Sequence, residues 1–106
     1  MSKTKLSLTA KPTFVANVPI PIPGAPPVLV EMTFKGRTRE QFREFVAGLV
    51  GKDDVQVVMD ICSGWDLEDA FDAANVAVLT DNYMGAANAV VDVYFQQLTQ
   101  ARLKNS

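Results

Sequence analysis

Prolines occupy alternate positions in one stretch of the chain, and this pattern limits what the stretch can form. Pro19, Pro21 and Pro23 alternate with Ile20 and Ile22. Proline has no backbone N–H, and residues two apart in a strand direct their N–H groups toward the same edge. One edge of the stretch therefore lacks hydrogen-bond donors, which predicts an edge strand. Polyproline II is the alternative conformation for this spacing.

Two runs in which apolar residues alternate with others predict a β-hairpin around this stretch. The segment Gly24 to Pro27 separates the runs, and so proline-rich a connection indicates a loop longer than two residues. The residues expected on the inward face are Phe14, Ala16, Val18, Ile20 and Ile22 in the first run, and Val28, Val30, Met32 and Phe34 in the second.

Capping signals predict two helices after the hairpin. Thr38 and Gln41 form a capping box for the first helix, which should end at Gly51. Asp53 offers a second capping box with Gln56. The apolar faces are Phe42, Phe45, Val46, Leu49 and Val50 in the first helix, and Val55, Val58, Met59 and Cys62 in the second, which should end at Gly64. Val57 and Val58 leave a strand open as the alternative in the second segment.

Two further helices follow an irregular acidic segment that begins at Trp65. Asp72 should cap a short helix, and the last helix should run from Ala86 to Arg102. The expected apolar residues are Val76, Leu79 and Tyr83 in the first of these, and Ala87, Val91, Tyr94, Phe95 and Leu98 in the second. The fold class is therefore α+β: an N-terminal antiparallel β-hairpin packed on three to four α-helices. We expect a single domain over residues 12–105 after a flexible N-terminal tail, residues 1–11.

Composition excludes several kinds of chemistry. The chain of 106 residues has no histidine, which removes histidine-based catalysis and histidine metal ligands. Cys62 is the only cysteine, so an internal disulfide and a multi-cysteine zinc site are excluded, and a reducing compartment is expected. The chain shows no signal peptide, and no apolar run reaches the roughly 20 residues that span a bilayer. We expect a soluble intracellular protein without membrane contact.

Charge is distributed unevenly along the chain. Up to Lys52 there are eight basic and three acidic residues, whereas from Asp53 to Ala101 there are nine acidic residues and no basic one. An acidic stretch repels phosphate backbones, so nucleic acid is not an expected partner. The asymmetry suits head-to-tail self-association or docking of a basic partner, and an acidic surface that serves solubility is the alternative.

One acidic cluster is the candidate for metal chemistry. It consists of Asp66, Glu68, Asp69 and Asp72. Carboxylates bind Ca²⁺ or Mg²⁺, so a metal-dependent hydrolase that uses Asp66, Glu68 and Asp69 is one hypothesis. The spacing lacks the glycine and the terminal glutamate of an EF-hand loop, which favours a solvated loop with a helix cap. Because no phosphate-binding or dinucleotide glycine pattern is present, we expect no enzyme activity, no cofactor and no metal.

Several single residues have two interpretations each. Cys62 occupies an apolar helical position, which favours the core over a nucleophile, since no histidine base exists. Trp65 is either a plug that closes the core or an anchor for a partner, and the core is favoured for it, as for Tyr83 and Tyr94. Either core filling or an adaptable docking surface is expected for Met32, Met59 and Met84.

Short segments also follow one another in a familiar order. They are the strand Phe14 to Gly24 with its Val/Ile-Pro alternation, the Gly-Trp-Asp-Leu segment at 64–67, the break at 82–86, and the Ala-Arg-Leu-Lys-Asn ending at 101–105. In this combination the chain resembles the small tail assembly chaperones of long-tailed bacteriophages and related prophages. The resemblance covers residues 12–105 and includes no catalytic motif.

The resemblance implies a role in phage tail morphogenesis. Such chaperones coat the long, largely helical tape measure protein in the bacterial host cytoplasm before tail tube protein polymerises around it, and they are absent from the mature virion. A longer form, made by a translational frameshift, recruits the tube protein, and this chain would be the short form. We also expect a homo-oligomer. A structural virion component, such as a head–tail adaptor or minor tail protein, is the alternative.

The expected partner-binding residues belong to the acidic segment, the break and the chain end. A tape measure helix would lay its apolar face into a groove between helices of the chaperone. The end of the chain is included because the longer form would continue from there. The residues are Trp65, Asp66, Leu67, Asp69, Tyr83, Arg102 and Lys104.

Overall fold

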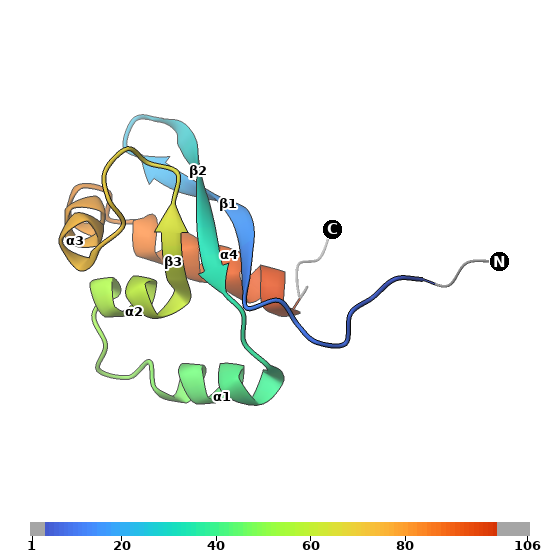
Figure 1. Cartoon of the computed structure of the whole chain (residues 1–106). Helices are drawn as coiled ribbons and strands as arrows, with labels where there is room; N and C mark the ends of the chain where they lie inside the picture. Colours follow the sequence, from blue (N-terminus) through green and yellow to red (C-terminus); the bar gives the residue numbers. More distant parts are fainter. Residues whose placement is uncertain (1–3, 100–106) are drawn as a thin grey trace.

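The computed structural model of the protein describes residues 4–99. In chain order, the elements in this range are two strands, two helices, a short third strand and two more helices (Figure 1). The α+β class with an N-terminal antiparallel hairpin is confirmed. The elements are β1 (Thr13–Ile22), β2 (Ala25–Lys35), α1 (Arg39–Ala47), α2 (Asp54–Ile61), β3 (Cys62–Trp65), α3 (Ala73–Asn82) and α4 (Ala86–Thr99).

The β1–β2 hairpin confirms the prediction from the prolines. The sheet order is β1-β2-β3, so β1, which contains Pro19 and Pro21, is an edge strand. The predicted long loop is wrong, because only Pro23 and Gly24 connect the strands. Gly24 has a φ of +75°, and proline followed by such a glycine is the pattern of a type II turn. Pro23 therefore belongs to the turn and not to the strand edge.

The third strand corrects the prediction that α2 continues to Gly64. Cys62 takes extended backbone angles, with φ −113° and ψ 155°, and this ends α2. Residues 62–65 then pair antiparallel with β2, so Trp65 lies in a strand and not in an irregular segment. The edge of β2 that β1 leaves open has N–H and C=O groups that need partners, and β3 supplies them. This requirement lies outside the local sequence, so the helical pattern alone overshoots.

The predicted helix starts are confirmed. Both capping boxes are formed, with the side chains of Thr38 and Asp53 each accepting from the backbone N–H three residues later. Asp72 caps α3 by accepting from the N–H of Asn75. The strand alternative for residues 57 and 58 is not formed, since both lie in α2.

The predicted end of α1 is wrong. The helix ends at Ala47 with Gly48 as its cap, and Gly51, with a φ of +87°, belongs to the turn that follows. Leu49 and Val50 therefore lie outside the helix, and Val50 is 91% exposed. The ribbon of α1 lies at the margin of the fold in Figure 1, and Phe42 and Phe45 pack from it against Tyr94 of α4.

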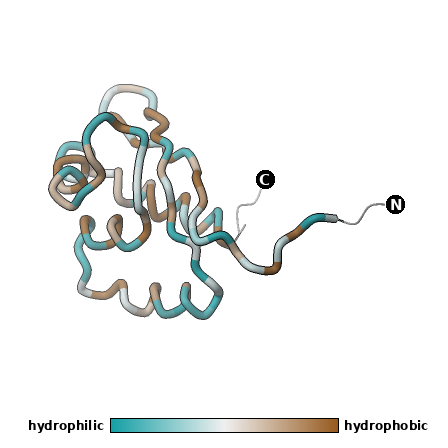
Figure 2. Tube along the Cα trace, in the orientation of Figure 1, coloured by the Kyte–Doolittle hydropathy of each residue, from teal (hydrophilic) through white to brown (hydrophobic). Residues whose placement is uncertain are grey.

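The core lies between the sheet and the helices α2, α3 and α4. Alternate residues of β1 and β2 point into it, as predicted, while the residues between them are exposed or partly exposed. Val28 departs from the prediction because it lies near the hairpin turn and is 53% exposed. In Figure 2 the deep teal of charged residues marks much of α1 but is missing from the hairpin turn. The core residues are Val18, Ile20, Val30, Met32, Phe34, Phe45, Val58, Ile61, Cys62, Val76, Ala86, Ala87, Val90 and Tyr94.

Candidate partner-binding site

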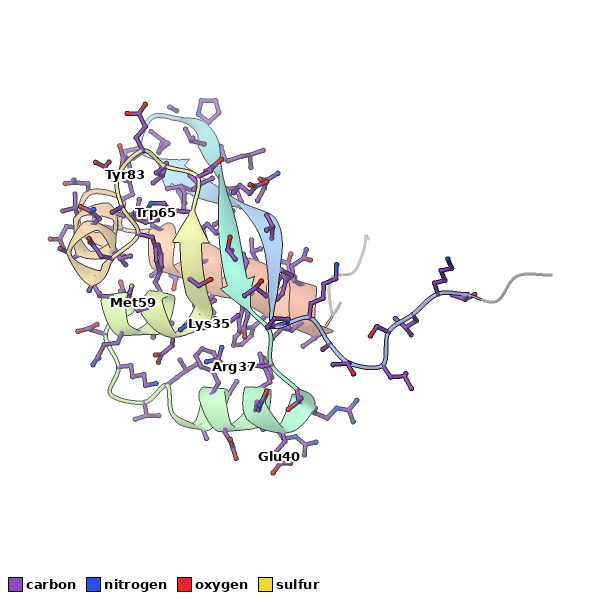
Figure 3. The ribbon with its side chains drawn as sticks, in the orientation of Figure 1. Lys35, Arg37, Glu40, Met59, Trp65 and Tyr83 are labelled. Carbon is purple, nitrogen blue, oxygen red and sulfur yellow. The ribbon has the colours of Figure 1, made fainter. Side chains whose placement is uncertain are left out.

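A surface pocket of about 170 Å³ lies between α3 and the segment that follows β3. It contains four of the predicted partner-binding residues, three from the stretch 65–69 and one from position 83. Figure 3 shows two of them, Trp65 and Tyr83, on the same side of the molecule. The lining residues are Trp65, Leu67, Asp69, Asn75, Val78, Leu79, Asn82 and Tyr83.

Trp65 forms one wall of this pocket, which we call the α3 pocket. Its ring packs edge-on against Phe71, with the ring centroids 5.0 Å apart and the planes at 88°. Its indole Nε1–H donates a hydrogen bond to the backbone carbonyl of Asp69 at 2.7 Å. Because the side chain is half-buried, Trp65 closes one side of the core and also presents a surface to the pocket.

Tyr83 forms another part of the wall of the α3 pocket, where it is half-buried and packs against the core, as predicted. It follows α3 as its cap residue, and its N–H donates to the carbonyl of Leu79 at 2.9 Å. Leu67 and Val78 add exposed apolar surface, with exposed fractions of 37% and 55%. The pocket is therefore apolar at its walls.

Asp66 does not line the α3 pocket. Its N–H donates to the carbonyl of Glu31 at 3.0 Å, and its carboxylate Oδ1 accepts from the N–H of Glu31 at 3.1 Å. Both bonds continue the pairing of β2 with β3 by one residue. Asp66 therefore holds the chain against β2 at the point where it leaves the sheet.

The acidic cluster does not converge. Within residues 4–99, no three His, Cys, Asp or Glu side chains lie close enough to share a metal ion. Asp66 and Asp72 hold backbone N–H groups, while Asp69 lies at the α3 pocket. Asn75 donates from Nδ2 to the carbonyl of Ala70 at 2.8 Å, which closes the segment onto α3.

The remaining predicted residues do not form a second site in the described part of the chain. Arg102 and Lys104 lie outside the described residues. A shared methionine surface is wrong, because Met32 is fully buried whereas Met84 is 87% exposed.

Arg37, which contacts three separate parts of the fold, was missed by the sequence analysis. Its guanidinium donates to the hydroxyl of Tyr94 at 2.8 Å and to the backbone carbonyl of Asp60 at 3.0 Å. It also stacks over the ring of Phe45, 4.5 Å from the centroid. Arg37 therefore joins α1, α2 and α4 (Figure 3), and the rings of Phe42 and Phe45 add contacts between α1 and α4.

Lys35 assists Arg37 at the end of α2. Its Nζ donates to the carbonyl of Met59 at 3.1 Å, next to the carbonyl that Arg37 holds. The last turn of α2 contains no basic residue, so these two cations from another part of the chain satisfy its carbonyls. The sequence contained one signal for this arrangement. The last turn of α2 has no basic residue, while Lys35 and Arg37 stand at the end of β2 and just after it.

Tyr94 completes this network from α4. Its hydroxyl accepts from Arg37 and donates to the backbone carbonyl of Lys35 at 2.7 Å. Burial raises the pKa of Tyr94 above its ordinary value, and the hydrogen bond and charge of Arg37 oppose that shift. The buried hydroxyl is thus satisfied as donor and as acceptor, which confirms Tyr94 as a core residue.

Cys62 is buried at 1% exposure, as predicted, and this gives a test of its environment. Burial raises the pKa of its thiol from 9.0 to about 12, with the Lys35 charge opposing the shift.

This shift predicts how stability depends on pH. Above pH 9.0 the thiol ionises in the unfolded chain but stays neutral in the folded one. The part of the free energy of unfolding that comes from the neutral thiol is therefore present below pH 9.0 and is lost as pH rises toward about 12. In Cys62→Ala this loss is absent. We therefore expect the stability advantage of the wild type over Cys62→Ala to shrink between about pH 7 and about pH 10, measured by urea denaturation. A constant advantage would contradict the buried neutral thiol.

Comparison with known proteins supplies the context for these surfaces. The sequence profile described as phage tail assembly chaperone matches residues 1–105. No curated protein and no solved structure gives a significant match. Within residues 4–99, none of the helices has the length and apolar character needed to cross a membrane. The family acts in the host while tails are assembled, and it is not a known class of enzyme. With nearly all of its residues inside the matched range, this chain belongs to the phage tail assembly chaperone family.

Proposed function

We propose that the protein binds and coats the tape measure protein in the bacterial host cytoplasm, and that it does so without catalysis. The observation that supports this is the α3 pocket, which brings together Trp65, Leu67, Asp69 and Tyr83. A long helical protein exposes apolar faces until the tube surrounds it, so it needs a cover of this kind. The mature virion would lack the chaperone.

The chemistry of the α3 pocket suits an amphipathic helix. Aromatic and aliphatic walls accept the apolar side chains of a helix that lies across the opening. The exposed carboxylates of Glu68 and Asp69 stand beside these walls and favour basic residues on the partner. We infer that the docked helix carries lysine or arginine next to its apolar stripe.

Coating a long partner requires several copies of the chaperone, so we propose that the chain self-associates. The excess of basic residues before Asp53 and of acidic residues after Lys52 supports attraction between unlike ends of neighbouring copies. Recruitment of tail tube protein would belong to a longer, frameshifted form of the chain that continues beyond Arg102 and Lys104.

The test is co-expression of the tagged protein with the longest open reading frame just downstream in its genome. We expect that long protein to become soluble and to co-purify with the wild type. Val78→Arg, at the α3 pocket, should weaken its capture by about tenfold or more, because a cation replaces an apolar contact. The matched control is Val50→Arg, since Val50 is exposed on another part of the surface and should tolerate the change.

The outcomes separate the function from the site. If the wild type fails to capture the long protein, the tape measure function is wrong. If Val78→Arg captures it as well as Val50→Arg does, the function stands and the site is wrong. Mass spectrometry of purified phage particles tests the alternative that the protein is a structural virion component. Such a component would be present in the particles, whereas a chaperone would be missing.

A further inference from the structure

The residues before β1 form an arm that projects from the fold. Figure 1 shows this part of the chain leading away from the sheet and from the helices. We define the N-terminal arm as residues 4–8, in which every residue is exposed. Leu6 and Leu8 are 78% and 97% exposed, and they alternate with polar residues. Such alternation is typical of a strand that covers an apolar surface with one of its faces. The arm therefore has the pattern of a strand that requires a surface outside its own fold.

A groove of about 470 Å³ lies between β1 and α4. Its lining extends along α4 from Gly85 to Gln96, which is about 16 Å at about 1.5 Å per residue. An extended strand of about five residues covers the same length. The helix follows β1 over this distance, since Gly85 meets Pro21 near one end and Tyr94 stacks on Phe14 near the other. The groove therefore has the length of a short strand.

The outer edge of β1 offers backbone groups along this groove. Pro12 accepts from the N–H of Gly36 at 2.8 Å, so even-numbered residues of β1 direct their N–H and C=O groups toward β2 and odd-numbered residues direct theirs outward. Within residues 4–99, no strand pairs with that outer edge. The prolines at the edge have no N–H, whereas Thr13, Val15 and Asn17 keep theirs. An added strand can therefore form hydrogen bonds with the half of β1 that lacks proline.

The arm and the groove match in spacing and in charge. The two leucines of the arm are about 7 Å apart in an extended strand. Ala89 and Val93 are apolar residues of the groove lining that stand one turn apart, which is about 6 Å along α4. Asp92 adds an exposed carboxylate to the same lining, and α4 contains no basic residue that would oppose its attraction for Lys5 of the arm.

The base of the arm is held on the β2 side of β1, opposite to the groove. Gly36, which follows β2, donates to the carbonyl of Pro12, and a Cβ on Gly36 would come within 2.7 Å of the carbonyl oxygen of Lys11. To reach the groove of its own chain, the arm would have to leave Gly36 and reverse its direction within residues 9–11. The arm of a second copy enters the groove without either change.

We propose that the N-terminal arm of one copy adds as a strand to the outer edge of β1 in a second copy, where Leu6 and Leu8 cover the groove side of α4. The arm and the groove are different surfaces, so the contact is head-to-tail and each copy joins two neighbours. The proposal rests on the self-association in the proposed function and gives it a mechanism. It is tested on the purified chain alone, so its failure is distinct from a failure of tape measure binding.

The first experiment is sedimentation of the purified protein over a range of concentrations. We expect the wild type to associate, and the dissociation constant to rise about tenfold or more in the double variant Leu6→Ser/Leu8→Ser, because two leucines lose their burial. Val50→Ser is the control, since it removes an apolar side chain that is 91% exposed outside the arm. Asp92→Lys should weaken association about threefold or more, whereas Asp81→Lys, exposed on α3, should not. Circular dichroism verifies that the variants keep the fold.

The second experiment measures strand addition at the edge of β1. Hydrogen exchange followed by NMR reports each backbone amide separately. The N–H groups of Thr13, Val15 and Asn17 should exchange more slowly as the protein concentration rises, because they gain acceptors from the arm of a neighbour. In Leu6→Ser/Leu8→Ser their exchange should stay fast over the same concentrations.

Each result supports or overturns the proposal. Association and amide protection that both depend on the leucines of the arm support it. A wild type that is monomeric at all concentrations overturns it, as does association that survives Leu6→Ser/Leu8→Ser. Protection of the β1 edge in a monomer would show that the arm folds back on its own chain, which also overturns the proposal. Capture of the long downstream protein is measured separately, and its absence contradicts the tape measure function alone.

Discussion

Replacing Tyr94 by alanine should lower the free energy of unfolding by about 3–5 kcal/mol, the range for removing a buried aromatic ring. The side chain is fully buried, and its loss leaves a cavity at the centre of the aromatic core. Domains of this size have about 5–15 kcal/mol in total, so much of the stability disappears. Urea denaturation followed by circular dichroism measures the change. The rings around Tyr94 are those of Phe14, Phe34, Phe42 and Phe45.

Two further variants separate the causes of this loss. Tyr94→Phe keeps the ring and removes only the hydroxyl, which leaves a donor of Arg37 and the carbonyl of Lys35 without their partner, and should cost about 1–3 kcal/mol. Tyr83→Ala, at a half-buried tyrosine, should cost less than Tyr94→Ala. Equal midpoints for Tyr94→Ala and the wild type would show that α4 does not complete the core.

Arg37→Met should destabilise the protein by about 2–4 kcal/mol, the sum expected for charged hydrogen bonds and a cation–π contact. Methionine keeps an aliphatic chain of similar length but donates no hydrogen bonds. The carbonyl of Asp60 and the hydroxyl of Tyr94 lose their donor, and Phe45 loses the stacked guanidinium. We therefore expect α1 to detach before the rest of the fold.

Limited trypsin digestion measures that detachment directly, because Arg39 and Arg43 lie within α1. Cleavage at these residues should be faster in Arg37→Met than in the wild type. Arg43→Met is the control for stability, since Arg43 is exposed on the same helix. If Arg37→Met and Arg43→Met unfold at the same urea concentration, Arg37 does not hold α1 in place.

The elements that follow from local chemistry were predictable, and those that depend on distant partners were not. The hairpin follows from alternation, and the caps at Thr38, Asp53 and Asp72 follow from side chains that satisfy backbone groups nearby in the chain. The strand β3 depends on an open edge of β2, which no pattern within residues 62–65 expresses. The two-residue turn depends on a single glycine angle at Gly24.

The same distinction applies to the functional surfaces. Trp65, Leu67 and Asp69 were found because they are close in sequence, and Tyr83 joins them through the packing of α3. Arg37 was missed because its partner Tyr94 is 57 positions away. A cation after a strand has no distinctive local pattern, so only the fold reveals what it holds.

The position of Tyr94 in α4 also has a consequence for how the protein forms during translation. The ribosome completes both long strands and α1, α2 and α3 before it reaches the ring that fills their core. Until then the inner face of the hairpin, with Val18, Met32 and Phe34, has no helix α4 to cover it. A nascent chain that stalls before α4 would expose this surface to aggregation. We therefore expect the core to close only when α4 docks on the sheet.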